Sequence, residues 1–248
     1  MSLRAPPAPA SPPLGRLYLI PSPLWETTDC LQMTPETLEI TRRLRYFVVE
    51  EAKTARRVLK VMGHPGPMAA LHMTLLNEHT PPAELAQRLQ PALQGHDMGL
   101  LSEAGCPAVA DPGAPLVRLA HQQGITVCPL TGPSSLLLGL MASGLEGQRF
   151  CFHGYLPIDP AQRRSQLQQL EKRSRQARET QLFIETPYRN QGLLRTLLDT
   201  LDASTWLCVA QHLGSPQQWI HTTTIGHWSR KPPTLAERTP SIFLFLAG

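Results

Sequence analysis

Short apolar runs alternate with amphipathic stretches through the first half of the chain, and this alternation predicts strands separated by helices. One helix is expected to begin at Thr34, whose hydroxyl suits an N-cap, with Pro35 at the first helical position. The predicted strands are Arg16–Ile20, Tyr46–Val49, Leu71–Leu76, Met98–Leu101 and Ile125–Leu130, and the other helices are Glu51–Val61, Pro82–Leu93 and Pro115–Gln122. This spacing predicts a parallel sheet with helices on both faces.

The pattern changes in the second half of the chain, after Gly144. Helices are predicted over Ala161–Ala177 and Asn190–Leu201. The predicted strands are Phe150–Tyr155, Thr180–Ile184, Trp206–Ala210, Trp219–Thr224 and Ser241–Leu246, the last three with only loops between them. Consecutive strands without helices predict an antiparallel or mixed sheet. We therefore expect an α/β protein with two domains, 15–131 and 132–248, after a disordered Pro/Ala-rich leader over 1–14.

Two loops that follow predicted strands are rich in small and turn-forming residues. Leu100–Gly113 contains glycines, prolines and four small side chains, so it turns tightly and leaves its main chain approachable. Leu130–Ser135 leads into a helix that Ser134 or Ser135 can cap. Loops at the carboxyl ends of parallel strands are where such folds bind ligands, although a structural loop is the simpler alternative. The spacing does not identify the ligand.

Composition narrows the classes of function. The 248 residues carry a formal net charge of +4, which permits contact with nucleic acid without requiring it. Five scattered cysteines without Cys-x-x-Cys spacing predict buried free thiols in a reducing cytosol. The histidines lack metal-ligand spacing, so we expect no metal. We also expect no membrane span, no nicotinamide-binding glycine motif and no hydrolase elbow.

Two basic clusters are candidate contacts for RNA phosphate. The first lies on the predicted helix 161–177 and its end, and comprises Arg163, Arg164, Lys172, Arg173, Arg175 and Arg178. The second precedes the ligand loops and comprises Arg42, Arg43, Arg45, Lys53, Arg56, Arg57 and Lys60. Basic side chains on one surface attract nucleic acid, but solvated helices carry the same residues. Both interpretations stay open.

Three segments of the chain carry a more specific signal in their residues and in their order along the chain. They are Ser102–Gly113 (Ser-Glu-Ala-Gly-Cys-Pro-Ala-Val-Ala-Asp-Pro-Gly), Leu130–Ser135 (Leu-Thr-Gly-Pro-Ser-Ser) and Arg149–Pro157 (Arg-Phe-Cys-Phe-His-Gly-Tyr-Leu-Pro). Together they resemble the tetrapyrrole (corrin/porphyrin) methylase superfamily, and most closely its ribosomal RNA small-subunit methyltransferase I branch, which methylates a cytidine ribose 2′-hydroxyl. Glu185–Arg189 (Glu-Thr-Pro-Tyr-Arg) looks like that branch's Glu-Ser-x-His-Arg.

The resemblance implies a methyltransferase that uses S-adenosylmethionine, built from two αβα domains with the cofactor in the cleft between them. It also implies a homodimer that acts on RNA, and the free thiols predict a cytoplasmic protein. Residues that match the family's cofactor motifs are Leu24, Ala104, Gly105, Cys106, Val109, Ser134, Ser135, Glu185 and Leu213. A ribose hydroxyl benefits from a nearby base, and the candidates are Glu103, Asp111, His153 and Glu185.

The sequence departs from the branch on the expected substrate side. Trp25-Glu26 stands where the branch has Gly-Asn, and Lys53 stands where it has Arg. Gln211–Ser215 lacks the charges of the corresponding family segment. Two alternatives to an RNA methyltransferase therefore remain, namely an enzyme for a small molecule such as a tetrapyrrole and a non-catalytic paralogue that keeps the cofactor pocket.

Overall fold

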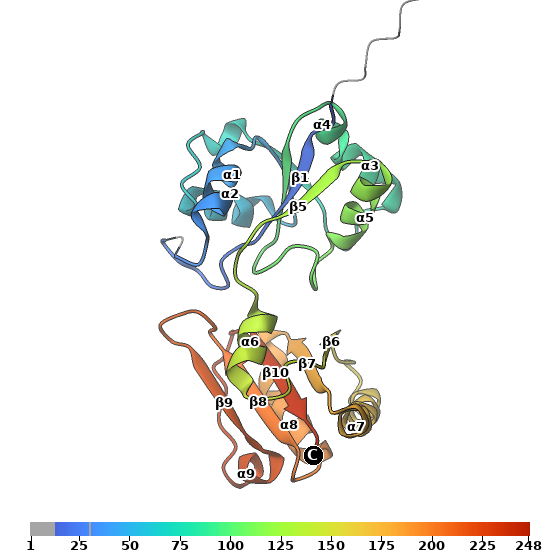
Figure 1. Ribbon diagram of the computed structural model, residues 1–248. Helices are drawn as coiled ribbons and strands as arrows, with labels where there is room; N and C mark the ends of the chain where they lie inside the picture. Colours follow the sequence, from blue (N-terminus) through green and yellow to red (C-terminus); the bar gives the residue numbers. More distant parts are fainter. Residues whose placement is uncertain (1–12, 30) are drawn as a thin grey trace, which may run out of the picture. The chain divides into compact units, whose positions relative to one another are not determined.

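The computed structural model describes residues 13–29 and 31–248, and its chain forms two compact units, one up to Pro133 and one from Ser134 (Figure 1). Most of the leader predicted over 1–14, and Cys30, lie outside the described residues. Each unit contains its own five-stranded sheet, so each is described separately.

The first unit is built on a parallel sheet, as the sequence predicts. Its strands are β1 (Arg16–Ile20), β2 (Tyr46–Val49), β3 (His72–Leu75), β4 (Met98–Leu101) and β5 (Thr126–Pro129), in the spatial order β3-β2-β4-β1-β5. Its helices are α1 (Pro35–Arg43), α2 (Ala52–Val61), α3 (Leu85–Arg88), α4 (Gln90–Leu93) and α5 (Ala114–Gln122), with short 3-10 turns at Met68–Ala70 and Pro82–Glu84.

Helices cover both faces of this first sheet, with α1 and α2 on one side and α3 and α5 on the other (Figure 1). Phe47 and Leu59 are fully buried in the core on the α2 side, and Leu100 and Leu116 are buried in the core on the α5 side. Each such side chain contributes about 1.5–3 kcal/mol by leaving water. Both cores hold the sheet rigid, and the loops at its edge are free to carry function.

One predicted helix of the first unit is wrong. The sequence pattern predicts a single helix over Pro82–Leu93, but the chain forms a 3-10 turn followed by the separate helices α3 and α4. Pro91 explains the break, because a proline inside a helix has no N–H to donate to the preceding turn. In α4 it occupies one of the first two positions, where that N–H is not needed.

The second unit is built on a mixed sheet, again as predicted. Its strands are β6 (Phe150–Tyr155), β7 (Thr180–Glu185), β8 (Trp206–Gln211), β9 (Trp219–Thr224) and β10 (Ser241–Leu246), in the order β6-β7-β10-β8-β9. Only β6 and β7 pair in parallel. Its helices are α6 (Ser135–Ser143), α7 (Pro160–Ala177), α8 (Asn190–Thr200) and α9 (Ile225–Arg230), with a 3-10 turn at Pro187–Arg189.

Helix α9 corrects the prediction that only loops separate the last three strands. Thr224 caps it by accepting the His227 main-chain N–H, and Ile225 and Trp228 bury its apolar side in the core formed with α7 and α8. Helix α6 packs on β10, where a Cβ on Gly139 would lie 3.3 Å from Ile242.

Candidate functional site

The loop that follows β4 is fastened to the end of β1 by its main chain. Ser22 and Gly105 form an isolated antiparallel bridge, with N–H to O distances of 2.9 and 3.0 Å. The buried Ser22 hydroxyl donates to the Ser102 carbonyl at 2.5 Å, and the Ser102 hydroxyl donates to the Gly105 carbonyl at 2.6 Å. These contacts fix the first turn of the loop at the carboxyl edge of the sheet.

The second turn of this loop is organised by the Asp111 carboxylate. One oxygen, Oδ1, accepts the Ala108 N–H at 3.0 Å and the Gly113 N–H at 2.6 Å. Ala108 and Ala110 adopt positive φ angles of 63° and 55°, a region that costs an L-residue roughly 1–2 kcal/mol. Burial raises the pKa of Asp111, and the two main-chain hydrogen bonds oppose that rise. Asp111 therefore acts first as a structural group of the loop.

The fold brings together the cofactor residues that the sequence predicts in the first unit. Ala104 and Val109 are exposed, and Cys106 and Leu24 are partly exposed, around the buried Gly105. Gly105 has a φ of 69°, and a Cβ added there would lie 3.3 Å from Leu24 Cδ2. The loop thus offers small side chains and main-chain groups next to one apolar residue.

The predicted residues of the second unit lie on different elements. Ser134 is the N-cap of α6, as predicted, and accepts the Leu137 N–H at 3.5 Å, while Ser135 is the first helical residue. Glu185 ends β7, and Leu213 is buried two residues beyond β8. Glu185 and Gln211 both pair with Ser241 across the sheet, so the ends of β7 and β8 share one edge.

Glu185 forms a buried ion pair with Arg189. Its Oε1 accepts both Nε and Nη2 of Arg189, at 2.9 and 2.5 Å, and the Thr186 N–H at 2.6 Å. The Glu185 side chain is fully buried, and its second oxygen, Oε2, has no hydrogen-bond partner among the described residues. The carboxylate is therefore held in place by its own turn.

The other two base candidates differ in their surroundings. The His153 Nε2 lies 2.6 Å from Oε1 of Gln181, whose amide nitrogen donates to the main-chain oxygen and to Oε1 of Glu179. Because Gln181 presents an oxygen, His153 carries its proton on Nε2. Glu103 is exposed and accepts no hydrogen bond from the described residues. Burial raises the pKa of Glu50, and the nearby charge of Glu103 adds to that rise.

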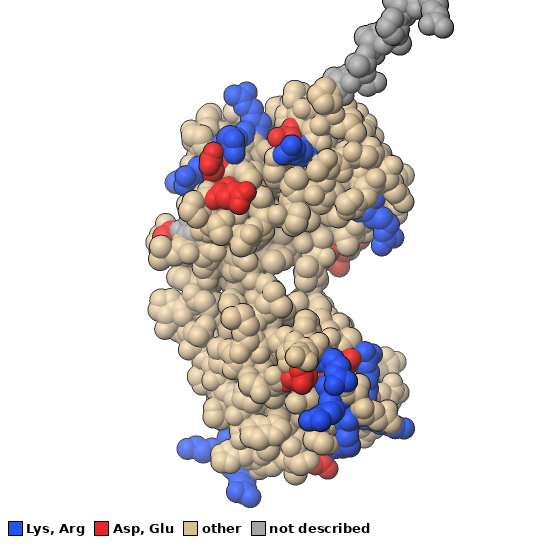
Figure 2. Space-filling model, in the orientation of Figure 1, with Lys and Arg blue, Asp and Glu red and all other residues tan. Residues whose placement is uncertain are grey.

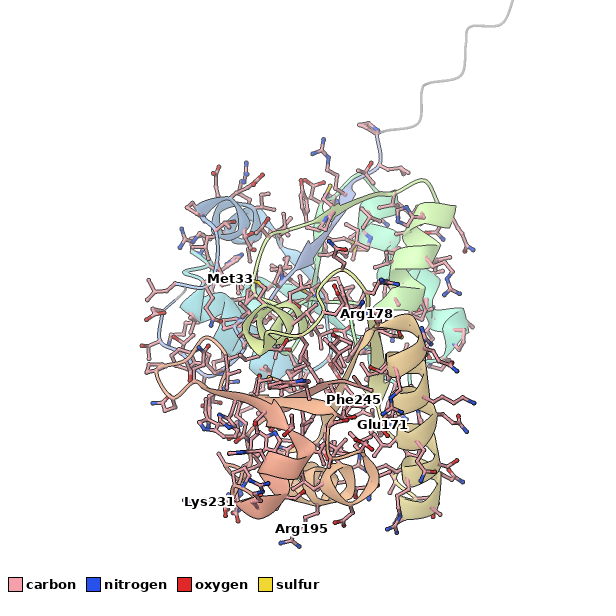
Figure 3. The ribbon with its side chains drawn as sticks, turned by 60° about the horizontal axis from the view of Figure 1, so that its bottom comes forward. Met33, Glu171, Arg178, Arg195, Lys231 and Phe245 are labelled. Atoms are coloured by element: carbon pink, nitrogen blue, oxygen red, sulfur yellow. The ribbon has the colours of Figure 1, made fainter. Side chains whose placement is uncertain are left out.

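Basic side chains gather along α7 on the face shown in Figure 2. Some have structural partners, because Arg173 Nε lies 2.9 Å from Glu179 and Arg175 donates to the Gly248 carbonyl at 2.8 Å. Arg178 ends the helix in the left-handed conformation (Figure 3), and the buried Glu171 accepts the Asp202 N–H at 2.8 Å and the Thr205 hydroxyl at 2.5 Å. The remaining residues of the predicted cluster are Arg163, which is partly buried, and Arg164 and Lys172, which are exposed.

Two buried polar residues that fix this geometry were not predicted from the sequence. Ser22 and Gln181 each have a hydrogen-bond partner far away along the chain, Ser102 and His153 respectively. Their only sequence signal is a polar residue within or beside an apolar strand. The expectation of buried thiols is also wrong for Cys106, Cys128 and Cys151, which are partly exposed, whereas Cys208 is buried.

The described residues offer neither a metal site nor a membrane-spanning helix. No group of three or more His, Cys, Asp or Glu side chains lies close enough to hold a metal ion. None of the helices in the described part of the chain is long and apolar enough to cross a membrane.

Comparisons with known proteins identify the family. The model of the tetrapyrrole (corrin/porphyrin) methylases matches residues 29–228. The chain is 31% identical to the ribosomal RNA small subunit methyltransferase I of Escherichia coli O157:H7 over 212 residues, covering 86% of this chain and 70% of that protein. It is 35% identical to the Pseudomonas aeruginosa protein of the same name, covering 76% of this chain and 61% of that protein.

A solved structure supports the same assignment at the level of the fold. The uroporphyrin-III-C-methyltransferase of Thermus thermophilus superimposes with a TM-score of 0.53 at 18% identity, covering 94% of this chain and 92% of that one. The resemblance inferred from the motifs is therefore confirmed. The chain is a methyltransferase that belongs to the tetrapyrrole (corrin/porphyrin) methylase family.

Proposed function

We propose that this protein transfers the methyl group of S-adenosylmethionine to a ribose 2′-hydroxyl of small-subunit ribosomal RNA. The relatives at 31 and 35% identity are both named as ribosomal RNA small subunit methyltransferases, and this supports the RNA substrate over a tetrapyrrole. The single observation that supports the use of this cofactor is the structure of the loop 102–113. The loop is hydrogen-bonded to Ser22 and built from small residues.

The residues of this loop fit such a cofactor chemically. An adenine ring needs an apolar surface and main-chain hydrogen bonds, which Leu24, Val109 and the approachable main chain around Gly105 supply. The positive sulfonium needs oxygen atoms nearby, and carbonyl groups of the loop meet that need. Ser134 and Ser135 at the start of α6, together with Glu185 and Leu213, are the proposed contacts from the second unit.

Methyl transfer is an in-line displacement, so positioning supplies most of the catalysis. S-adenosylmethionine, when bound, supplies a methyl group on a positively charged sulfur. The protein must hold the ribose hydroxyl and accept its proton as the new bond forms. Among the four candidates, Asp111, His153 and Glu185 are already engaged by neighbours, whereas Glu103 is exposed and unengaged. We therefore assign the base to Glu103.

The test combines calorimetry with methyl transfer. Titration with S-adenosylmethionine and with its demethylated product should show binding near micromolar, which corresponds to roughly 8 kcal/mol. Radiolabelled methyl should pass to small-subunit ribosomal RNA that lacks the modification. Glu103→Gln should keep the cofactor affinity and lower the transfer rate by about 10²-fold or more.

Three outcomes would change the proposal. Binding without transfer to any RNA would favour the non-catalytic paralogue, and transfer to a tetrapyrrole would favour the small-molecule enzyme. An unchanged rate in Glu103→Gln would remove Glu103 from the mechanism while leaving the function intact.

Two further features complete the proposal. We place the protein in the cytoplasm, where its RNA substrate would be found, and we assign it a homodimeric assembly on the strength of its family resemblance. Light scattering of the purified protein tests the assembly, since a monomeric mass at micromolar concentration would contradict it.

A further inference from the structure

A cavity lies in the first unit, at the edge of the sheet opposite the loop 102–113. It has a volume of about 470 Å³. Its lining includes Arg16 at the start of β1, Tyr46 at the start of β2, and His96 and Asp97 just before β4. Because these strands are parallel, their amino ends share one edge, and the loops after β1 and β4 lie at the other. This cavity is therefore separate from the proposed cofactor loop.

The charge of this cavity is predominantly positive. Arg16, Arg43 and Arg45 line it, and all three are exposed. The acidic residue in the lining is Asp97, whose Oδ1 accepts the main-chain N–H of Arg16 at 2.8 Å. Arg43 also pairs with Glu39 at 3.4 Å, but both side chains are more than 60% exposed, so the pair is weak. The arginines can therefore turn toward an anion.

Aromatic rings stand beside these arginines. Tyr46 stacks with His72 at a centroid distance of 4.9 Å and with His96 at 5.2 Å. The three rings come from the neighbouring strands β3 and β2 and from the residue pair that precedes β4. His72 and His96, the two outer members of the stack, are exposed to solvent. Planar rings next to several arginines are the combination that binds unpaired bases and their phosphates.

We propose that this cavity binds a single-stranded segment of the RNA substrate, with phosphates on Arg16, Arg43 and Arg45 and a base against the His96–Tyr46 stack. This inference rests on the proposed function. Arg16 begins β1, Arg43 ends α1 and Arg45 directly precedes β2, so the arginines are spread along an open edge. That spread suits successive phosphates of a strand better than one enclosed phosphate. The cavity is then an RNA-docking site apart from the chemistry.

The first test compares two matched double variants. Arg43→Gln with Arg45→Gln removes two charges from the cavity, and Arg195→Gln with Lys231→Gln removes two exposed charges from the second unit, where Figure 3 shows them projecting outward. Binding of small-subunit ribosomal RNA is measured over a range of salt concentrations, and S-adenosylmethionine affinity is measured in parallel. The cavity variant should lose about tenfold in RNA affinity, and its salt slope should fall by about 1.4, as expected for two lost contacts to a single strand.

The second test maps the contact directly. RNA carrying a photoreactive uridine is crosslinked to the wild-type protein, and the crosslinked peptides are identified by mass spectrometry. The peptides that contain Tyr46 or His96 should be labelled, and His96→Ala should reduce that labelling.

The outcomes separate this inference from the proposed function. If the wild type binds and methylates RNA while the cavity variant matches the Arg195 and Lys231 control, the docking site is wrong and the function stands. Crosslinks confined to peptides that contain neither Tyr46 nor His96 would also overturn it. If the wild type neither binds nor methylates RNA, the proposed function fails and the docking site fails with it.

Discussion

Ser22 and Gly105 exchange main-chain hydrogen bonds of 2.9 and 3.0 Å between the turn after β1 and the loop after β4. The pairing places the left-handed Gly105, with a φ of 69°, beside Leu24 at the carboxyl edge of the first sheet. The neighbouring Ala104 is small and exposed, so a flat ligand can approach the loop closely at this point.

Gly105→Ala should damage the proposed cofactor site more than the fold. The left-handed backbone costs alanine roughly 1–2 kcal/mol, and the new Cβ lies 3.3 Å from Leu24. Calorimetry should therefore show S-adenosylmethionine affinity reduced by about tenfold or more, equivalent to about 1.4 kcal/mol. Gly147→Ala is the matched control, because a Cβ there meets nothing within 4 Å. Equal affinities of the two variants would contradict the placement of the cofactor.

Asp111→Asn should change how stability depends on pH. Burial raises the pKa of Asp111 in the folded protein above its ordinary value of 3.8, so the folded state binds more protons than the unfolded chain does. The contribution of Asp111 to the free energy of unfolding therefore falls as the pH rises from about 3.8 through the folded pKa. Asparagine keeps an oxygen for the Ala108 and Gly113 N–H groups and does not titrate.

Urea unfolding of the wild type and of Asp111→Asn at a series of pH values measures this effect. The stability of the wild type relative to the variant should decline as the pH rises through that range and then level off. If the difference in stability between the wild type and the variant stays constant across the pH series, the pKa of Asp111 is not raised by folding.

Glu185→Gln should destabilise the second unit. Removing one partner of a buried ion pair leaves an uncompensated charge and costs roughly 3–5 kcal/mol, and the 23% exposure of the Arg189 side chain favours the lower end. Chemical denaturation measures the loss. The double variant Glu185→Gln with Arg189→Met should recover part of it, because the orphaned charge is gone. If the loss of stability in the double variant equals the sum of the losses in Glu185→Gln and in Arg189→Met, the two side chains are not coupled.

Arg164→Gln with Lys172→Gln tests α7 as an RNA surface. These residues are exposed, whereas Arg173 and Arg175 of the same helix are tied to Glu179 and Gly248. If α7 contacts RNA, the variant should lose affinity and its salt slope should fall by about 1.4. If the RNA affinity and the salt slope of the variant match those of the wild type, α7 is a solvated helix that does not contact RNA.

Local sequence signals predicted the caps and strands of this fold well. Thr34 accepts the Thr37 N–H at 3.2 Å before a helix that starts with Pro35, and the last strand covers Ser241–Leu246 as predicted. Such features depend on neighbouring residues. Helix α9 escaped detection because its six residues present only a short apolar side.

The residues of the candidate site could be predicted from the sequence, but the role of each residue could not. The resemblance of the motifs supplied Glu103, Asp111, His153 and Glu185 together. What separates them is contact with groups that spacing does not reveal, such as Gln181 beside His153. The cavity at Arg16 and Tyr46 was equally hidden, because it forms only when the amino ends of three strands come together.

The two left-handed alanines, Ala108 and Ala110, have a consequence for how the first unit opens. Strained backbone and a desolvated carboxylate lower the local cost of unfolding this loop relative to the buried strand β4 that precedes it. Its amide hydrogens should therefore exchange with deuterium well before those of Leu100 and Leu101. A ligand that binds the loop would slow that exchange. The exchange rate of the loop amides therefore measures whether a ligand is bound.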